Sequence, residues 1–231
     1  MESRHKRYID GLRKPDPKNS KAGICEMNYF ASNKLLEGVV KVEFNSLYPN
    51  LFVKLYRDGT LDRFGIEIPD EKLVEKVEYF LNHRFRIRAW GEADYQNYKI
   101  WINSMYNKEL RGVALDLFDI YHQYMTQYYN DIKELNRNRW LYTDIDMMYL
   151  SASSVDDIVV PRVDTSYKFP YTKTKVEFLY IERLMRYVEY SEGVDFKTKG
   201  YYSKYKPDDV ISLMKSAIRN QKLTSIIGEE A

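Results

Sequence analysis

The stretch Leu141–Leu150, LYTDIDMMYL, places two aspartates inside a run of apolar and aromatic residues. Strand-forming residues flank them on both sides, so the stretch predicts two short strands joined by a tight hairpin. Asp144 and Asp146 then lie at the turn. Aspartate is a favoured turn residue, and a purely structural role is one interpretation. A carboxylate near a sheet interior is costly unless it is paired or bound to a metal, which favours a second interpretation, a cation site.

A third acid completes a candidate metal platform. Glu43 lies in VVKVEF, a strand-like run over residues 39–44, and Pro49 turns the chain just beyond it. Carboxylate oxygens are the ligands that Mg²⁺ prefers, and Mg²⁺ is often held by one or two carboxylates together with substrate phosphates. Three acids on adjacent strands therefore predict a site for two Mg²⁺ ions, with Mn²⁺ as a substitute, and a phosphate-bearing substrate.

A phosphate-bearing substrate also needs cations and hydrogen-bond donors. Lys99 and Asn103 are four residues apart in a predicted helix and share one face, with Tyr106 on nearly the same face. Lys99 is placed to reach a phosphate and Asn103 to donate a hydrogen bond to one. This spacing is common in helices, so an ordinary solvated face is the alternative.

In the rest of the chain, segments whose apolar residues recur with the 3.6-residue period of a helix alternate with short strand-like apolar segments. They predict helices over residues 69–85, 91–110, 108–135 and 207–222, and strands over 39–44, 158–163, 176–181 and 186–190. Strands at both ends of a helical middle favour an α+β fold, an antiparallel sheet backed by helices. Residues 1–22 are predicted to form a mobile or extended arm.

Composition bounds the class of protein. The chain has 231 residues, 44% hydrophobic and 30% charged, as expected of one large or two small soluble globular domains. No apolar run approaches the roughly 18 residues of a membrane span, so we expect no membrane partner and a soluble, reducing compartment. The single cysteine excludes an internal disulfide framework and a cysteine-type zinc site.

Positive charge is gathered in three places although the net charge is only +2. Residues 1–22 carry seven Lys/Arg against three acids, residues 197–222 carry seven against two, and residues 84–88 carry three arginines. Such segments can track the phosphates of a nucleic acid. The alternative is that each is a solvated surface face.

Three of these stretches together resemble family B DNA polymerases. EFNSLYPNL (43–51) resembles motif A, QNYKIWINSMYN (96–107) resembles motif B, and YTDIDMMY (142–149) resembles motif C, in the family's order. RYVEYSEGVDFKTKG (186–200) resembles the later Lys-x-Tyr region, most like that of the T-even-type phage enzymes. The resemblance covers about residues 39–220.

The resemblance implies a role for each matching residue. Glu43 and Asp146 stand at the two principal metal-binding positions, with Asp144 at the first aspartate of motif C. The implied nucleotide-binding residues are Ser46, Leu47, Tyr48, Lys99, Asn103 and Tyr106, and Arg84 and Arg88 are added as phosphate contacts that no motif fixes. The implied DNA-binding residues are Arg186, Tyr187, Lys197 and Lys199.

The implied organisation is a polymerase palm with a short two-helix fingers insertion. We expect a basic arm and lead-in over residues 1–38, palm over 39–65, fingers over 66–107, palm over 108–206, and a C-terminal helix and tail over 207–231. We also expect the family's exonuclease domain and most of its thumb to be lacking.

The implied activity is template-directed DNA synthesis. A primer 3′-hydroxyl would attack the α-phosphate of a deoxynucleoside triphosphate, and pyrophosphate would leave with the help of two metal ions. The implied partners are primer–template DNA, deoxynucleoside triphosphates and further polymerase subunits. A viral or phage origin, and with it the cytoplasm of a host cell, is an expectation from the resemblance alone.

Four departures from the family's motifs keep other functions open. Glu43 replaces an aspartate, Asn107 a glycine, Met147 a serine, and Met185 aligns with the lysine of Lys-x-Tyr. An extra methylene moves a carboxylate by roughly 1 Å, and misplacement on that scale costs about a hundredfold in rate. One alternative is a catalytically degenerate palm that acts as a DNA-binding or scaffold subunit of a replication or virion assembly. Another is a different metal-dependent nucleotidyltransferase, such as a primer-making enzyme.

Overall fold

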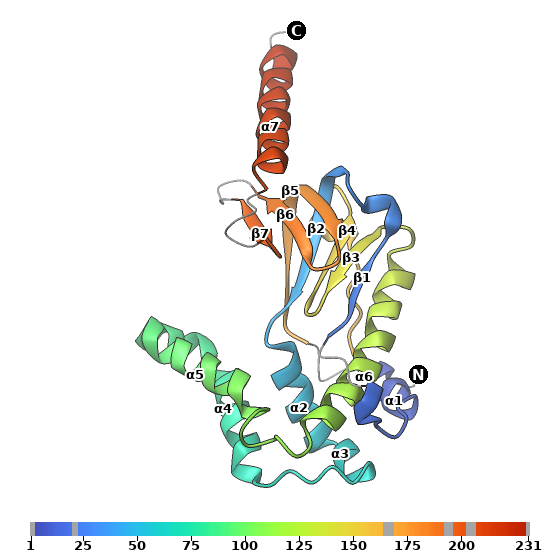
Figure 1. Ribbon diagram of the computed structural model, residues 1–231, viewed down its shortest axis with the longest axis vertical. Coiled ribbons are helices and arrows are strands. Elements are labelled where there is room, and N and C mark those ends of the chain that lie inside the picture. The colour runs from blue at the N-terminus through green and yellow to red at the C-terminus, as the bar shows by residue number, and fades with distance from the viewer. Residues whose placement is uncertain (1–2, 20–22, 164–168, 192–195, 202–206, 230–231) are drawn as a thin grey trace. The chain divides into compact units, whose positions relative to one another are not determined.

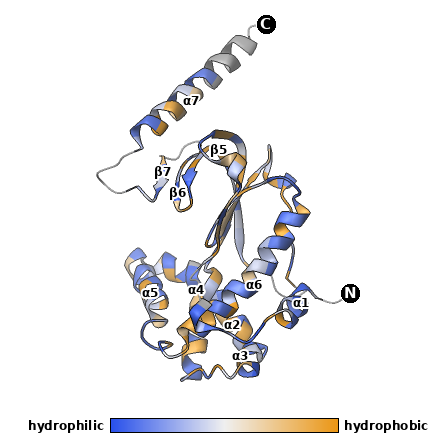
Figure 2. Ribbon diagram, turned by 45° about the vertical axis from the view of Figure 1, so that its right-hand side comes forward, coloured by the Kyte–Doolittle hydropathy of each residue, from blue (hydrophilic) through white to orange (hydrophobic). Residues whose placement is uncertain are grey.

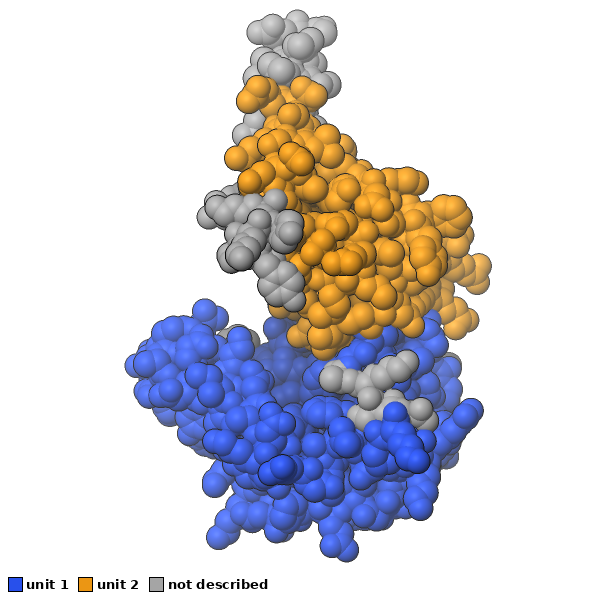
Figure 3. Space-filling model, viewed as in Figure 1, with its two compact units in different colours: residues 1–24, 44–132, 161–171 blue, residues 25–43, 133–160, 172–231 orange. Residues whose placement is uncertain are grey.

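A computed structural model describes residues 3–19, 23–163, 169–191, 196–201 and 207–229. The chain forms two compact units, each assembled from three segments (Figure 3). The first contains residues 1–24, 44–132 and 161–171, and the second contains residues 25–43, 133–160 and 172–231. Helices dominate the first unit and a sheet dominates the second, so the predicted α+β class is confirmed. Among the described helices, none has both the length and the apolar character needed to cross a bilayer.

The sheet of the second unit carries all strands of the described residues (Figure 1). Its order is β1-β3-β4-β2-β5-β6-β7, with bounds Cys25–Met27, Trp140–Asp144, Met147–Ser151, Leu35–Phe44, Tyr171–Arg183, Arg186–Tyr190 and Lys197–Lys199. The pairs β1–β3, β3–β4, β2–β4, β5–β6 and β6–β7 are antiparallel. The predicted antiparallel sheet and the hairpin around the two aspartates are therefore confirmed.

Alternation along the strands divides apolar residues between the two faces of the sheet. One face gathers a cluster that contains Val39, Tyr142, Tyr149, Leu179, Ile181 and Tyr187, all at most 5% exposed. Val40, Val42, Met148 and Leu150 alternate with these residues and are also fully buried. Because both faces carry apolar side chains, polar residues within the sheet such as Thr143 and Asp144 are excluded from water.

Helix α7 (Asp208–Glu229) covers part of the sheet within the second unit. Its Met214 is buried in a cluster with Phe178 of β5 and Val188 of β6. This confirms both the helix predicted over 207–222 and the prediction that a helix backs the sheet.

The first unit consists of helices. They are α1 (Arg4–Asp10), α2 (Leu47–Arg57), α3 (Thr60–Arg63), α4 (Glu71–Trp90), α5 (Glu92–Met105) and most of α6 (Ala114–Leu135). Figure 2 shows hydrophilic and hydrophobic residues mixed along these helices, as expected of helices with one buried face. On α6 the buried face includes Leu117, Tyr121, Tyr124 and Tyr128, at the predicted spacing.

The predicted two-helix insertion is present as α4 and α5. The two helices meet at Gly91 and share a small core of Phe80, Ile87 and Ile102. The Phe80 ring stacks on the Tyr98 ring with centroids 5.6 Å apart. The α4–α5 helix pair is therefore held together by apolar contacts of its own.

The prediction of a mobile or extended N-terminal arm was wrong for the described residues. Ser3 caps α1, and Tyr8 is fully buried, with its ring 5.2 Å from that of Tyr124. The Tyr8 hydroxyl donates to Asp131 at 2.6 Å, and Arg7 pairs with the same carboxylate. The basic residues balance a local acid, and the buried tyrosine holds the helix in place.

The strand predicted over residues 158–163 was also wrong. The Asn136 side chain accepts from the Val159 N–H at 2.8 Å and donates to the Val159 carbonyl at 2.7 Å, so a side chain satisfies this backbone in place of a neighbouring strand. Pro161 has no N–H to offer to a ladder.

The five-segment domain scheme remains a prediction. The two compact units do not follow its boundaries, because β1, which lies in segment 1–38, pairs with β3.

Candidate functional site

The three predicted acids come together at one end of three neighbouring strands. In the register of the sheet, Asp144 of β3 lies opposite Met147 of β4, and Met147 lies opposite Glu43 of β2. Residues directly opposite in an antiparallel pair share a face. Glu43 and Asp144 therefore flank Met147 on one face, with Asp146 in the turn beside them.

The turn that carries Asp146 is strained. The Asp144–Met147 pair leaves only Ile145 and Asp146 to connect β3 and β4. Ile145 has φ 55°, in the left-handed region, which β-branched residues rarely occupy. Such strain costs on the order of 1–3 kcal/mol and is concentrated at functional sites in proteins. The chain thus holds its acidic turn in an unfavourable conformation.

Ile145→Gly is expected to raise the free energy of unfolding by about 1 kcal/mol, because glycine adopts positive φ without the clash of a β-carbon. Urea denaturation measures the change. Asn138→Gly is the matched control: Asn138 has φ 59°, but asparagine tolerates this conformation, so its change should be smaller. Equal changes in the two variants would show that the Ile145 turn is not specially strained.

The carboxylates influence one another electrostatically. Burial raises the pKa of Asp146, the charges of Glu43 and Asp144 raise it further, and Lys199 acts in the opposite direction. The Glu43 side chain is 43% exposed, whereas the whole of Asp144 is buried. A bound cation would relieve this repulsion, and the exposed Glu43 carboxylate is accessible to a cation from solvent.

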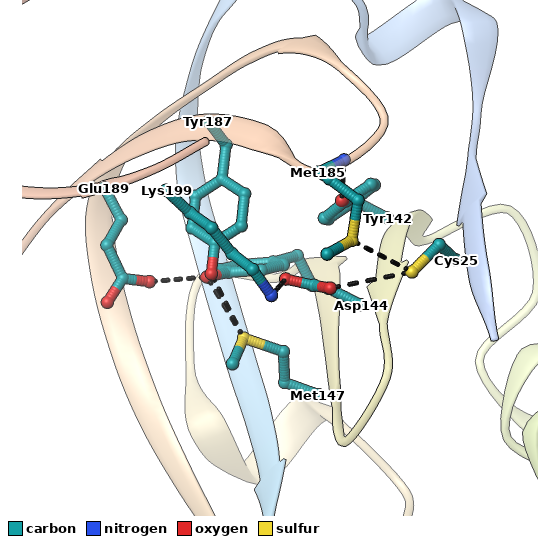
Figure 4. A network of polar contacts seen from close by, with 9 residues as sticks. Cys25, Tyr142, Asp144, Met147, Met185, Tyr187, Glu189 and Lys199 are labelled. Atoms are coloured by element: carbon teal, nitrogen blue, oxygen red, sulfur yellow. Dashed lines mark hydrogen bonds and ion pairs between the residues drawn. The ribbon is translucent and has the colours of Figure 1, made fainter. Parts of the chain in front are cut away.

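Asp144 already has a cationic partner. The Lys199 ammonium of β7 lies 2.5 Å from the Asp144 carboxylate. Figure 4 shows this ion pair. Cys25 lies on the other side, its Sγ 3.7 Å from Asp144 and 3.2 Å from the Met185 sulfur. Burial, with the Asp144 charge, raises the pKa of the Cys25 thiol. The first aspartate of the hairpin is therefore part of an internal ion pair.

Lys199→Met is expected to destabilise the fold by about 1–2 kcal/mol, because it leaves the buried Asp144 without its cation. The Lys199 side chain is 34% exposed, which keeps the value below that of a fully buried pair. Lys197→Met on the same strand is the control. Lys197 is 59% exposed and 3.5 Å from Glu189, so it should change stability by much less in the same denaturation assay. Equal small losses would show that Asp144 does not depend on Lys199.

A second ion pair lies deeper in the same face. Lys41 donates to Glu189 at 2.8 Å, and the Tyr149 hydroxyl donates to the other Glu189 oxygen at 2.6 Å. Lys41 also approaches Glu43 at 3.7 Å. Sequence reasoning missed this network, although the alternation in VVKVEF places Lys41 and Glu43 on one face.

The donor set fits Mg²⁺ only in part. In the described portion of the chain, no three acidic, histidine or cysteine side chains form a group able to hold a metal ion. With Asp144 paired to Lys199, Glu43 and Asp146 are the ligands that remain. Two carboxylates completed by water and substrate phosphates are a usual Mg²⁺ environment, so the residues fit an ion that arrives with its substrate.

In the first unit, two of the predicted nucleotide-binding residues meet. Ser46 precedes α2 with φ 51°, a second strained position, and Leu47 is buried at the helix start. The Arg84 guanidinium of α4 lies 3.5 Å from the Ser46 hydroxyl. Arg88, one turn later, pairs with Glu92 at 3.2 Å.

The other predicted nucleotide-binding residues divide between surface and core. Lys99 and Asn103 lie one turn apart on α5, as predicted, and both are exposed. Tyr106 is only 7% exposed; its hydroxyl lies 3.4 Å from that of Tyr121, whose ring also packs on Tyr48. Burial raises the pKa of Tyr106. Tyr106 is thus a core residue rather than a surface that a base would touch.

The predicted DNA-binding residues of β6 and β7 are mostly engaged within the sheet. Tyr187 is 5% exposed, and its hydroxyl lies 3.5 Å from the Met147 sulfur. Arg186 pairs with Glu182 at 2.9 Å. Lys197 remains largely exposed, whereas Lys199 is committed to Asp144.

No protein-family model and no curated protein sequence matches the chain. The resemblance to family B polymerases therefore rests on the motifs themselves.

Proposed function

We propose that this chain is the palm and fingers part of a DNA polymerase that transfers deoxynucleotides to a primer 3′-hydroxyl. One observation carries the proposal: residues from two separate motifs, Glu43 and the Asp144–Asp146 pair, meet at one end of three neighbouring strands, beside a strained turn. The charges of Glu43 and Asp144 raise the pKa of Asp146, so grouping the three acids is electrostatically unfavourable. A scaffold has no physical need for such a grouping, whereas a metal site does.

Each residue of the site has a distinct task in this proposal. Glu43 and Asp146 would hold Mg²⁺, which when bound lowers the pKa of the primer hydroxyl and neutralises charge on the departing pyrophosphate. The bond between the primer oxygen and the α-phosphorus forms as the α–β phosphoanhydride bond breaks. Asp144, fixed by Lys199, would hold the hairpin in position and keep Asp146 at its place in the turn.

The first unit would bind the incoming triphosphate. Lys99 and Asn103 are exposed on α5, and Arg84 is held beside Ser46 at the start of α2. These groups supply positive charge and hydrogen-bond donors, and in phosphoryl transfer positioning and charge neutralisation do most of the catalysis. The substrates would be primer–template DNA and deoxynucleoside triphosphates. Further polymerase subunits, a viral or phage origin and action in host cytoplasm belong to the same proposal.

A second candidate function is a palm that binds DNA without catalysis. Two internal lysines favour it: Lys199 forms an ion pair with Asp144, and the Lys41 ammonium lies 3.7 Å from the Glu43 carboxylate. In this version internal ammonium groups replace the metal ions, and the motifs persist as a structural network within a replication or virion assembly.

Primer extension distinguishes the two functions. A labelled primer–template is incubated with the chain, deoxynucleoside triphosphates and Mg²⁺, and then with Mn²⁺, which tolerates imperfect ligand geometry better. Extension that is lost in Asp146→Asn supports the polymerase. Binding of primer–template without extension under either metal supports the non-catalytic palm.

A further inference from the structure

A second surface of the sheet unit has features of a ligand site that the polymerase motifs do not include. Between β1 and β2 the short 3₁₀ turn Tyr29–Ala31 exposes two adjacent aromatic side chains. Tyr29 is 86% exposed and Phe30 is 83% exposed, the two highest values among large hydrophobic residues of the described chain. Single exposed apolar residues are normal, but two neighbouring rings beside a hollow mark an interaction site.

The hollow beside these rings has the size of a ligand site. Its volume is about 660 Å³. Its lining includes Met27, Tyr29, Phe30 and Trp140 together with the amides of Asn28 and Asn138. The apolar and aromatic lining offers stacking surfaces, and the amides and hydroxyl offer hydrogen bonds of the kind that orient a ligand.

The turn that presents the rings is held on both sides. The Asn28 side chain accepts from the Phe30 N–H at 3.1 Å and donates to the Trp140 carbonyl at 3.1 Å. Ala31 is buried, and Ser32 forms a bridge to Ile181 of β5. Because the backbone is fixed before any ligand arrives, little ordering entropy remains to oppose binding.

Positive charge lies beside the hollow. Residues 133–140, the end of α6 and the chain that leads into β3, hold three Lys/Arg against one acid. The Lys133 ammonium lies 4.1 Å from the centroid of the Trp140 ring and pairs with Glu26 of β1. Arg137, exposed one residue before the lining residue Asn138, is therefore the cation offered to a ligand. Aromatic faces beside a cation suit a single strand, because its unpaired bases can stack on the rings while its phosphate backbone meets the positive charge.

We propose that this hollow, the Tyr29–Trp140 platform, binds unpaired nucleotides of a single-stranded nucleic acid. Bases stack on Tyr29 and Phe30, and phosphates lie toward Arg137. A duplex is excluded because its bases are already stacked on one another. The proposal does not depend on nucleotidyl transfer, since the platform contains none of the three acids of the hairpin site.

Fluorescence anisotropy tests the proposal without primer, triphosphate or metal. The probes are a labelled oligothymidylate of about ten nucleotides, within the usual site sizes for single strands, and an abasic oligomer of the same length and charge. The double variant Tyr29→Leu, Phe30→Leu keeps apolar character but removes the aromatic faces. We expect it to weaken oligothymidylate binding about tenfold or more and to leave binding of the abasic oligomer unchanged.

Two further variants locate the contributions. Tyr29→Phe keeps the ring, so it should bind oligothymidylate as tightly as the original chain. Arg137→Gln should reduce the slope of log affinity against log salt by about 0.7, the value for one phosphate contact to a single strand. Both aromatic side chains are exposed, so these changes leave the core intact.

Three outcomes would overturn the proposal. The double leucine variant binds oligothymidylate as tightly as the original chain, or the abasic oligomer binds the original chain equally well. Alternatively, the original chain self-associates in sedimentation velocity, the aromatic substitutions abolish that association, and oligonucleotide binding is unaffected. The last result would assign the hollow to a protein–protein interface.

Discussion

Asp146→Asn is expected to reduce the primer-extension rate by about 10³-fold while the fold is retained. The substitution keeps the shape of the side chain and removes one of the two carboxylates proposed to hold the metal ion. Metal-ion stabilisation of transition-state charge is worth several kcal/mol, and about 1.4 kcal/mol corresponds to a factor of ten in rate. Single-turnover extension with saturating triphosphate measures the loss.

The same substitution should make the protein more stable at neutral pH. Burial and the neighbouring acids raise the pKa of Asp146 above its ordinary value of 3.8. A carboxyl whose pKa is raised by folding favours the folded state fully below its unfolded pKa, and this contribution is lost as pH rises through the folded pKa. Asparagine cannot ionise, so the variant avoids this loss. Lost activity with gained stability is the pattern of a functional site rather than of a structural one.

Asp144→Asn is the matched control because it lies two residues away in the same hairpin. Asp144 pairs with Lys199, so its removal should destabilise the fold as well as affect extension. If Asp146→Asn lowers stability as Asp144→Asn does, Asp146 also has a structural partner, and the hairpin is not a metal platform. If both variants extend primers at the original rate, the polymerase proposal fails.

The sequence was sufficient to predict the parts of the structure that are formed by residues close together in the chain. The hairpin at 141–150 follows from strand-forming residues around a turn, and the α4–α5 insertion follows from helical periodicity and Gly91. The pairing of β2 with β4 was a long-range step: the requirement for a third acid suggested that Glu43 lies beside the aspartates, and the motif resemblance gave the same placement. Periodicity alone does not specify which strands are neighbours.

The ion pairs could not be predicted because their partners are distant in sequence. Lys199 is 55 residues from Asp144, and Lys41 is 148 residues from Glu189. Strands β1 and β7 have three residues each, too few to show alternation, and β7 carries Lys199. The basic character of residues 197–222 suggested nucleic-acid contact. Lys199 of this segment instead pairs with Asp144, and no local sequence pattern identifies that partner.

Lys41→Met is expected to lower the free energy of unfolding by about 3 kcal/mol, more than the loss expected for Lys199→Met. Lys41 is 6% exposed and Glu189 is 3% exposed. Removing one partner of a buried pair leaves an uncompensated charge and costs about 3–5 kcal/mol. The low end applies because Lys197, at 3.5 Å, and the Tyr149 hydroxyl still face Glu189.

The double variant Lys41→Met, Glu189→Met should recover most of this loss, because replacing a whole buried pair by apolar residues is often close to neutral. Urea denaturation of both single variants and the double variant gives the coupling free energy. The surface pair Arg57–Glu78, also 2.8 Å long but with side chains 42% and 38% exposed, is the control. Arg57→Met should cost well under 1 kcal/mol. A Lys41→Met loss no larger than that would show that the buried pair contributes no net stability.

Glu189→Gln connects this network to the proposed chemistry. Without Glu189, the nearest acid to Lys41 is Glu43, 3.7 Å away. The ammonium then competes with the metal ion for the Glu43 carboxylate, so primer extension should need a higher Mg²⁺ concentration while the rate at saturating Mg²⁺ changes little. In the non-catalytic palm the same substitution alters only stability. A shifted Mg²⁺ requirement would therefore show that Glu189 keeps Lys41 away from Glu43 so that the carboxylate remains open to a cation.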